Sequence, residues 1–227
     1  MMILLPLLFV SNVAFGMADG AMQDVNTNGK RSFSKLTIDK VFNIKRSHIS
    51  KEASFSEEVN RPDANGNTQM HLAVMRAKKD KRLVEDLIKQ GADINQRNKE
   101  KDFPLKMAYM CSNKELVKYL IKHGADINQQ DRYGNTLLHL ATLENDEKMM
   151  TYFVEHGARI NQENEFEQTP LHFSTLWGNE KIISYLINHG ADMDKRDKNG
   201  QTPFDIAKQK GNEKAVDCLL KYMVEQV

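Results

Sequence analysis

A spacing of 33 residues runs through most of this chain and constrains its fold more than any other feature. Glycines recur at this spacing: Gly91, Gly124, Gly157 and Gly190. Small residues recur in the same way: Ala108, Ala141, Ser174 and Ala207. A fixed period of this length indicates one supersecondary unit that is repeated along a solenoid. We therefore expect a stack of similar units.

Each unit has a recognisable opening and close. The clearest opens with Gln168-Thr169-Pro170-Leu171-His172-Phe173-Ser174 and closes with Asn188-His189-Gly190-Ala191-Asp192. The spacing divides the chain into five units: 61–96, 97–129, 130–162, 163–195 and 196–227.

These units resemble ankyrin repeats, whose signature is a Gly-x-Thr-Pro-Leu-His-x-Ala opening and a Gly-Ala-Asp-Ile/Val-Asn close. The resemblance covers residues 61–227. It implies a β-turn or hairpin tip followed by two antiparallel helices in each unit, and hence an all-α solenoid. In the family, ligands usually meet the hairpin tips and the exposed face of each first helix, on the concave side.

The residues of the fourth unit support the same structure on physical grounds. Thr169 is a typical N-cap residue, and Pro170 follows at the first helical position, where proline is tolerated. A second helix follows Gly178-Asn179, and its apolar residues recur at helical spacing. Gly190 is suited to end that helix in a left-handed conformation. Gly134 and Gly200 suit tight turns that require a positive φ.

Some units depart from the signature. The first is two residues longer between Ala73 and Gly91 than the others, which indicates an insertion around Lys78–Lys81. The second carries Phe103 and Lys106 in place of threonine and histidine, so its local hydrogen bonding is expected to differ. The fifth carries Asp205 in place of histidine and lacks the closing Gly-Ala-Asp, as expected of a polar capping unit.

Residues 1–16 carry no charged side chain and contain a long apolar run, too short to span a bilayer. They match the apolar core of a secretory signal peptide, with cleavage after residue 16 or as late as residue 20. We therefore expect export to a periplasm or the medium. No Lys or Arg precedes the run, so an uncleaved leader or a misplaced start at Met17 or Met22, with a cytoplasmic protein, is the alternative.

Residues 17–60 are polar and are expected to form a largely disordered linker. Within them, segment 30–51 carries Lys30, Arg31, Lys35, Lys40, Lys45, Arg46 and Lys51 against Asp39 alone. This basic segment is interpreted either as a solvated linker or as an arm that contacts membrane headgroups or another polyanion.

The composition excludes several classes of function. The net charge of +1 argues against nucleic-acid binding by bulk electrostatics. Cys111 and Cys218 lie three units apart, so at about 10 Å per layer their Cα atoms are too far apart for a disulfide. We expect both to be free thiols.

No motif for catalysis, cofactor or metal binding is recognised. His123, His156 and His189 recur at the repeat spacing, but adjacent layers lie about 10 Å apart, too far for two ligands of one metal ion. The resemblance implies that the histidines of the signature slot form structural hydrogen bonds. We expect a monomer that is not an enzyme and binds no cofactor.

The remaining candidate for function is a binding surface. The hairpin tips include Arg132, Tyr133 and Phe166, and the helix slots after the signature alanine include Arg76, Met110, Leu143, Leu176 and Trp177. Exposed aromatic, Met and Arg side chains concentrate interface energy, although these side chains could instead pack between layers. We predict a protein-binding module that uses the concave surface. The alternative is membrane or polyanion association through segment 30–51.

Overall fold

The computed structural model describes residues 55–77 and 81–225, and the statements below refer to these residues. They form α-helices joined by turns, without a β-strand. The helices are α2 (Phe55–Val59), α3 (Gln69–Arg76), α4 (Arg82–Lys89), α5 (Pro104–Met110), α6 (Lys114–Lys122), α7 (Leu137–Leu143), α8 (Glu147–Glu155), α9 (Pro170–Ser174), α10 (Glu180–Asn188), α11 (Pro203–Gln209) and α12 (Glu213–Glu225).

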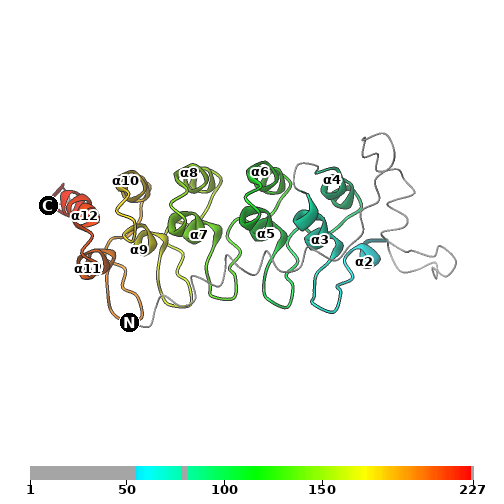
Figure 1. The fold of residues 1–227 in the computed structure, drawn as a ribbon, viewed down its shortest axis with the longest axis horizontal. Helices are drawn as coiled ribbons and strands as arrows, with labels where there is room; N and C mark the ends of the chain where they lie inside the picture. Colours follow the sequence, from blue (N-terminus) through cyan, green and yellow to red (C-terminus); the bar gives the residue numbers. More distant parts are fainter. Residues whose placement is uncertain (1–54, 78–80, 226–227) are drawn as a thin grey trace, which may run out of the picture. The chain divides into compact units, whose positions relative to one another are not determined.

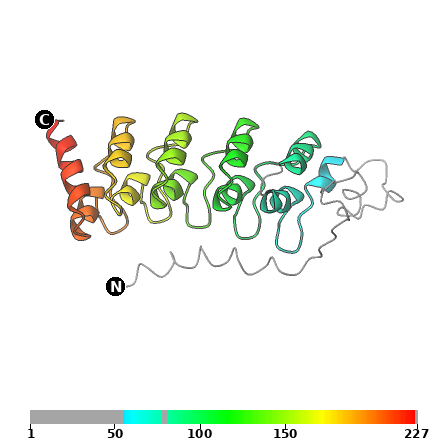
Figure 2. The same ribbon diagram turned by 45° about the horizontal axis from the view of Figure 1, so that its top comes forward.

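The helices from α3 onward form two parallel rows (Figure 1). The inner row contains α3, α5, α7, α9 and α11, and the outer row contains α4, α6, α8, α10 and α12. The hairpin tips project from the side of the inner row, as the turned view in Figure 2 also shows. Each predicted unit holds one inner and one outer helix. The all-α solenoid is thereby confirmed, and the units are called the first to fifth repeats from here on.

The caps of the fourth repeat follow the sequence signals. Thr169 is the N-cap of α9 with φ −93° and ψ 166°, and Pro170 is the first helical residue. The backbone N–H of Thr169 donates to Nδ1 of His172 at 3.0 Å. Gly190 follows α10 with φ +91°, a conformation in which glycine has no steric penalty.

The core lies between the two rows and between successive repeats. Leu138, Leu171, Ile183 and Leu186 are fully buried, and the equivalent positions of the other repeats are mostly buried as well. Because each helix pair buries its apolar side chains against its neighbours, no repeat has a complete core by itself.

A ladder of asparagines links the first four repeats to one another, and one further rung precedes the first repeat. In each rung, the side-chain N–H of the asparagine donates to the carbonyl of the glycine that closes the next helix pair. The side-chain oxygen accepts from the backbone N–H of the residue two positions after that glycine. For Asn128 these bonds reach Gly157 O at 3.1 Å and Arg159 N at 2.8 Å. The other rungs are Asn60, Asn95 and Asn161.

The structure differs from the expected linker at its C-terminal end. Helix α2 lies within the range 17–60, Val59 is buried, and Asn60 forms the first rung of the ladder. These residues are ordered because they continue the stacking of the first repeat. The predicted leader 1–16, the basic segment 30–51 and most of the insertion at 78–81 lie outside the described residues.

The unusual second and fifth repeats keep their inner helices by different means. Phe103 is the N-cap of α5 without a side-chain capping bond, and it is buried instead. In the fifth repeat, Asp205 replaces the histidine and its Oδ2 accepts from Thr202 N at 3.0 Å. These hydrogen bonds with Thr202 lower the pKa of Asp205. Cys111 and Cys218 are both free thiols, as predicted.

Candidate partner-binding surface

Apolar side chains gather at the C-terminal ends of the inner helices. Each repeat has a small residue at the end of its signature opening, which is Ala73, Ala108, Ala141 or Ser174 in the first four repeats. The position two residues after it, called the slot, holds Met75, Met110, Leu143 and Leu176. Met75 and Leu176 are 44% and 37% exposed, whereas Met110 and Leu143 are partly buried. The slot therefore forms an apolar stripe, called the inner stripe, that ends at the polar Gln209.

Trp177 is the most prominent residue beside this stripe. Its side chain is 59% exposed, yet its indole Nε1 donates to the carbonyl oxygen of Leu143 at 2.5 Å. The bond joins the third and fourth repeats and satisfies the only donor of the indole ring. The apolar faces of the ring thus remain open to solvent in a fixed orientation, which is the form in which aromatic side chains anchor interfaces.

The loop that carries Leu176 and Trp177 is held by the fifth repeat. The side-chain amide of Asn212 donates to Thr175 O at 2.8 Å and to Leu176 O at 3.3 Å. Gly178 follows with φ +60°, and a Cβ added there would lie 2.4 Å from Oδ1 of Asn212. A larger residue at position 178 would displace the Asn212 side chain that holds the loop. The exposed side chains of the loop are therefore presented on a backbone that Asn212 holds in place.

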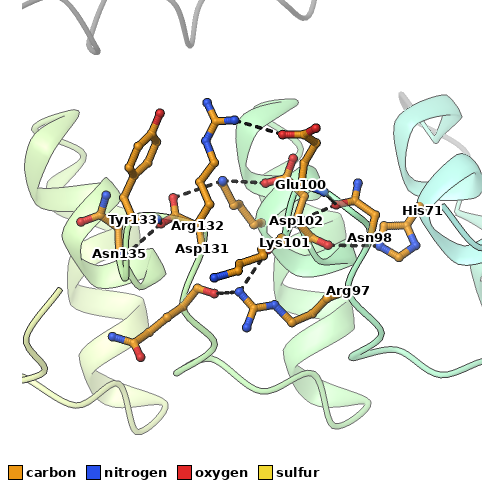
Figure 3. Close-up of polar contacts among 12 residues, drawn as sticks. His71, Arg97, Asn98, Glu100, Lys101, Asp102, Asp131, Arg132, Tyr133 and Asn135 are labelled. Carbon is orange, nitrogen blue, oxygen red and sulfur yellow. Dashed lines mark hydrogen bonds and ion pairs between the residues drawn. The ribbon is translucent and has the colours of Figure 1, made fainter. Parts of the chain in front are cut away.

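Arg132 and Tyr133 form a second group, on the hairpin tip of the third repeat (Figure 3). The Arg132 guanidinium lies 4.8 Å from the centre of the Tyr133 ring and 3.0 Å from a carboxylate oxygen of Glu100. Arg132 is exposed and Tyr133 is partly buried. Its two neighbours hold the guanidinium in place while leaving it open to solvent.

Phe166 lies on the next tip and is 52% exposed. Its backbone N–H donates to Oδ1 of Asn164 at 2.9 Å, and its carbonyl accepts from Lys198 N at 3.0 Å. Glu165 and Glu167 flank it and are exposed. The tip thus presents an exposed phenyl ring, on a hydrogen-bonded backbone, between two residues with carboxylate side chains.

The predicted residues do not form one patch. Phe166 precedes α9 and Trp177 follows it, so they lie at opposite ends of this helix. Arg76 ends α3 and is exposed, and Met110 ends α5 and is partly buried. The structure brings Leu143, Leu176 and Trp177 together at the helix ends, and Arg132 with Tyr133 at the tips. Met75 lies outside the predicted set, although it shares the slot of Met110 and is more exposed.

The signature histidines have a structural role, as the resemblance implied. Nδ1 of His139 accepts from the Thr136 backbone N–H at 3.2 Å, so Nε2 carries the proton and donates to Gln168 O of the next repeat at 3.0 Å. His71 and His172 make the equivalent bonds. Burial lowers the pKa of all three, that of His139 to about 4.

The second histidine series lies at the ends of the outer helices, where each ring stacks on a tyrosine four residues earlier. Ring centres are 4.0 Å apart for Tyr119 and His123, and the pairs at His156 and His189 are similar. Each Nδ1 is also within hydrogen-bonding distance of the carbonyl oxygen of its own tyrosine. Among the described residues, no group of three or more His, Cys, Asp or Glu side chains is arranged to hold a metal ion.

In the part of the chain that the structure describes, no helix is both long and apolar enough to cross a membrane. A comparison with curated proteins gives no match. A sequence model of the family described as ankyrin repeats (3 copies) matches residues 70–164 and again residues 159–226. These ranges cover more than half of the chain and contain all five helix pairs apart from a few terminal residues. The chain therefore belongs to the ankyrin repeat family, whose members are generally protein–protein interaction modules.

Proposed function

We propose that this protein is a non-catalytic binding module that holds a protein partner against its inner-helix face. The observation that carries the proposal is Trp177, which is 59% exposed although its indole N–H is bonded to the neighbouring repeat. An immobilised aromatic ring loses little conformational entropy when it is buried by a partner.

The inner stripe supplies the rest of the contact. Leu143 and Leu176 adjoin Trp177, and Met110 and Met75 continue the stripe into the second and first repeats. Unbranched apolar side chains such as methionine adapt to the surface of a partner. Arg76 at the first repeat and Arg132 at the third add charge at the edge, where it favours a complementary partner and faster association.

The experiment compares binding to wild type with binding to Trp177→Ala. Proteins that are retained by the immobilised wild-type protein are identified, and the dissociation constant of each is measured by calorimetry with both forms. A hot-spot tryptophan contributes about 2 kcal/mol or more, so binding should weaken about 30-fold or more. Helical content, measured by circular dichroism, should not change.

Two further variants locate the contact. Val224→Ala removes an exposed apolar side chain at the far end of the array and should leave binding unchanged. Phe166→Ala tests the tip separately, because Phe166 and Trp177 lie at opposite ends of α9. Normal binding by Trp177→Ala would refute the proposed surface. If Trp177→Ala binds normally and high salt abolishes its binding, attraction between the basic segment 30–51 and a polyanionic partner becomes the better explanation.

A further inference from the structure

The junction between the second and third repeats is the widest in the described array. At every other junction at least one pair of neighbouring helices makes close backbone contact: α3 with α5, α7 with α9, α8 with α10, α9 with α11, and α10 with α12. Neither α5 with α7 nor α6 with α8 makes comparable contact. The wider gap between α5 and α7 can be followed in Figure 1.

Larger side chains fill this junction. Phe103 occupies the slot that holds threonine in the other four repeats, and Tyr109 occupies a slot that holds Val74, Thr142, Thr175 or Lys208 elsewhere. Phe153 stands where the other outer helices carry leucine. All three are buried, and the rings of Tyr109 and Phe153 meet edge to face at 5.7 Å. The rings of Tyr109 in the second repeat and Phe153 in the third thus meet across the junction.

The junction also contains a buried polar atom without a satisfactory partner. The Tyr109 hydroxyl is buried, and its candidate acceptor is the Glu144 carboxylate of the third repeat, with which it does not form a well-aligned hydrogen bond. Burial, followed by the nearby Glu144 carboxylate, raises the pKa of Tyr109. A poorly aligned hydrogen bond stabilises a buried hydroxyl less than a well-aligned one, so the closed junction is less stable than one with full hydrogen bonding.

A backbone bond between tips is missing at the same place. Three pairs of neighbouring tips are joined by a backbone hydrogen bond: Lys99 N to Asn65 O at 3.1 Å, Glu165 N to Tyr133 O at 2.9 Å, and Lys198 N to Phe166 O at 3.0 Å. Within the described residues, the equivalent bond between Arg132 and Glu100 is not formed. The side chains of these two residues form an exposed ion pair instead.

Ion pairs also replace amides at this junction. Asp131 occupies a position that holds asparagine in the two neighbouring tips, as Asn98 and Asn164. Asp146 immediately precedes α8, whereas the residue at the same position before α6, α10 and α12 is asparagine. Lys106 Nζ lies 3.2 Å from Asp131 and 2.7 Å from Asp102, while Lys114 Nζ lies 2.5 Å from Asp146. The region of Asp131 is shown in Figure 3. Elsewhere the asparagine side chains bond directly to the preceding repeat.

We propose that this junction is a joint at which the array bends, with the first and second repeats moving as one block and the third to fifth as another. The two lysine–aspartate pairs hold the closed position. An ionic attraction falls off only slowly with distance, whereas a hydrogen bond is lost within a few tenths of an ångström. At the tips and at the starts of the outer helices, ionic links therefore permit a change of angle that the amide bonds at the equivalent places of other junctions resist. The Asn128 rung still joins the two blocks at the closing turn of the third repeat.

The joint crosses the inner stripe. Met75 and Met110 lie on one block, and Leu143, Leu176 and Trp177 lie on the other. Bending therefore changes the distance between the two halves of this surface. The joint itself rests on the packing described above and does not depend on the proposed partner.

The test measures distances between spin labels by double electron–electron resonance. In the full chain with Cys111→Ser and Cys218→Ala, one pair of labels is placed at Glu115→Cys and Lys181→Cys, which span the joint. The control pair is at Lys148→Cys and Lys214→Cys. The four sites are exposed equivalents on outer helices, and each pair is separated by two repeats.

Each pair is measured with and without Lys106→Met and Lys114→Met. For the pair that spans the joint, the fraction of molecules outside the closed distance should rise about fivefold or more, since the loss of one ion pair of about 1 kcal/mol corresponds to that factor. The control pair should not change. Lys195→Met, which breaks the ion pair with Glu163 away from the joint, should leave both pairs unchanged. Equal distributions for both pairs, or no response to loss of the lysines, would overturn the joint. Circular dichroism verifies that each variant is folded.

Discussion

The buried His139 should make the fold unstable in mild acid. In the folded chain, burial lowers the pKa of His139 to about 4, compared with an ordinary value of 6.5. The unfolded chain therefore binds a proton below pH 6.5, whereas the folded chain resists protonation until about pH 4. The contribution of neutral His139 to the free energy of unfolding is therefore complete above pH 6.5. It is lost progressively as the pH falls toward 4.

The magnitude follows from the two pKa values. Between pH 7 and pH 5 the linkage relation gives a loss of about 2 kcal/mol from His139 alone. His71 and His172 change stability in the same direction, because burial also lowers their pKa values. A loss of this size is a large fraction of the total stability of an ordinary domain.

The assay is urea denaturation followed by circular dichroism at several pH values. His139→Gln should be less stable than wild type at pH 7, but it should lose about 2 kcal/mol less between pH 7 and pH 5. His156→Gln serves as the matched control, since His156 is exposed, and it should keep the full wild-type dependence. The reasoning is refuted if the dependence is the same in wild type and His139→Gln.

Two further predictions concern a turn and the leader. Gly134→Ala should destabilise the fold by clearly more than the ~1 kcal/mol typical of a left-handed glycine, because its new Cβ would lie 2.5 Å from the backbone nitrogen of Glu165 on the next tip. Gly157→Ala, with open space around it, should show only the smaller effect. Equal midpoints of urea unfolding for the two variants would contradict this prediction. For the leader at residues 1–16, the intact mass of the protein from an exported fraction should correspond to a chain beginning near Met17 or Ala21, and a full-length chain confined to the cytosol would contradict export.

The regular part of the fold can be predicted from sequence because the same local signals recur. Thr169 and Pro170 fix the start of α9, and Gly190 fixes the end of α10, through backbone preferences that depend on few neighbours. Helix α2 carries no such signal. Asn60, which follows it, bonds to Gly91 and Asp93 of the first repeat, and a short polar stretch does not reveal that contact.

The candidate surface is less predictable because exposure depends on three-dimensional packing. The slot that holds Leu143 and Leu176 is visible in the sequence, but these two side chains differ in exposure. The bond from Trp177 to the Leu143 carbonyl joins residues in different repeats and has no sequence signature. The role of Lys106 was also hidden, since its charge matters only beside Asp131 of the next repeat.

The asparagine ladder has a consequence for how such a chain can change its length. Each rung needs only a carbonyl and a backbone N–H two residues apart, and each of the first four repeats supplies this pair of groups. Duplication of one of the first four repeats, or loss of the second or third, therefore leaves every remaining rung with a partner. An insertion inside a repeat is tolerated as well, provided that this pair of groups stays in place. The first repeat is two residues longer than the others, and Asn60 still bonds to Gly91 O and Asp93 N. The ladder thus fixes how successive repeats are joined and leaves the length of each repeat free to change.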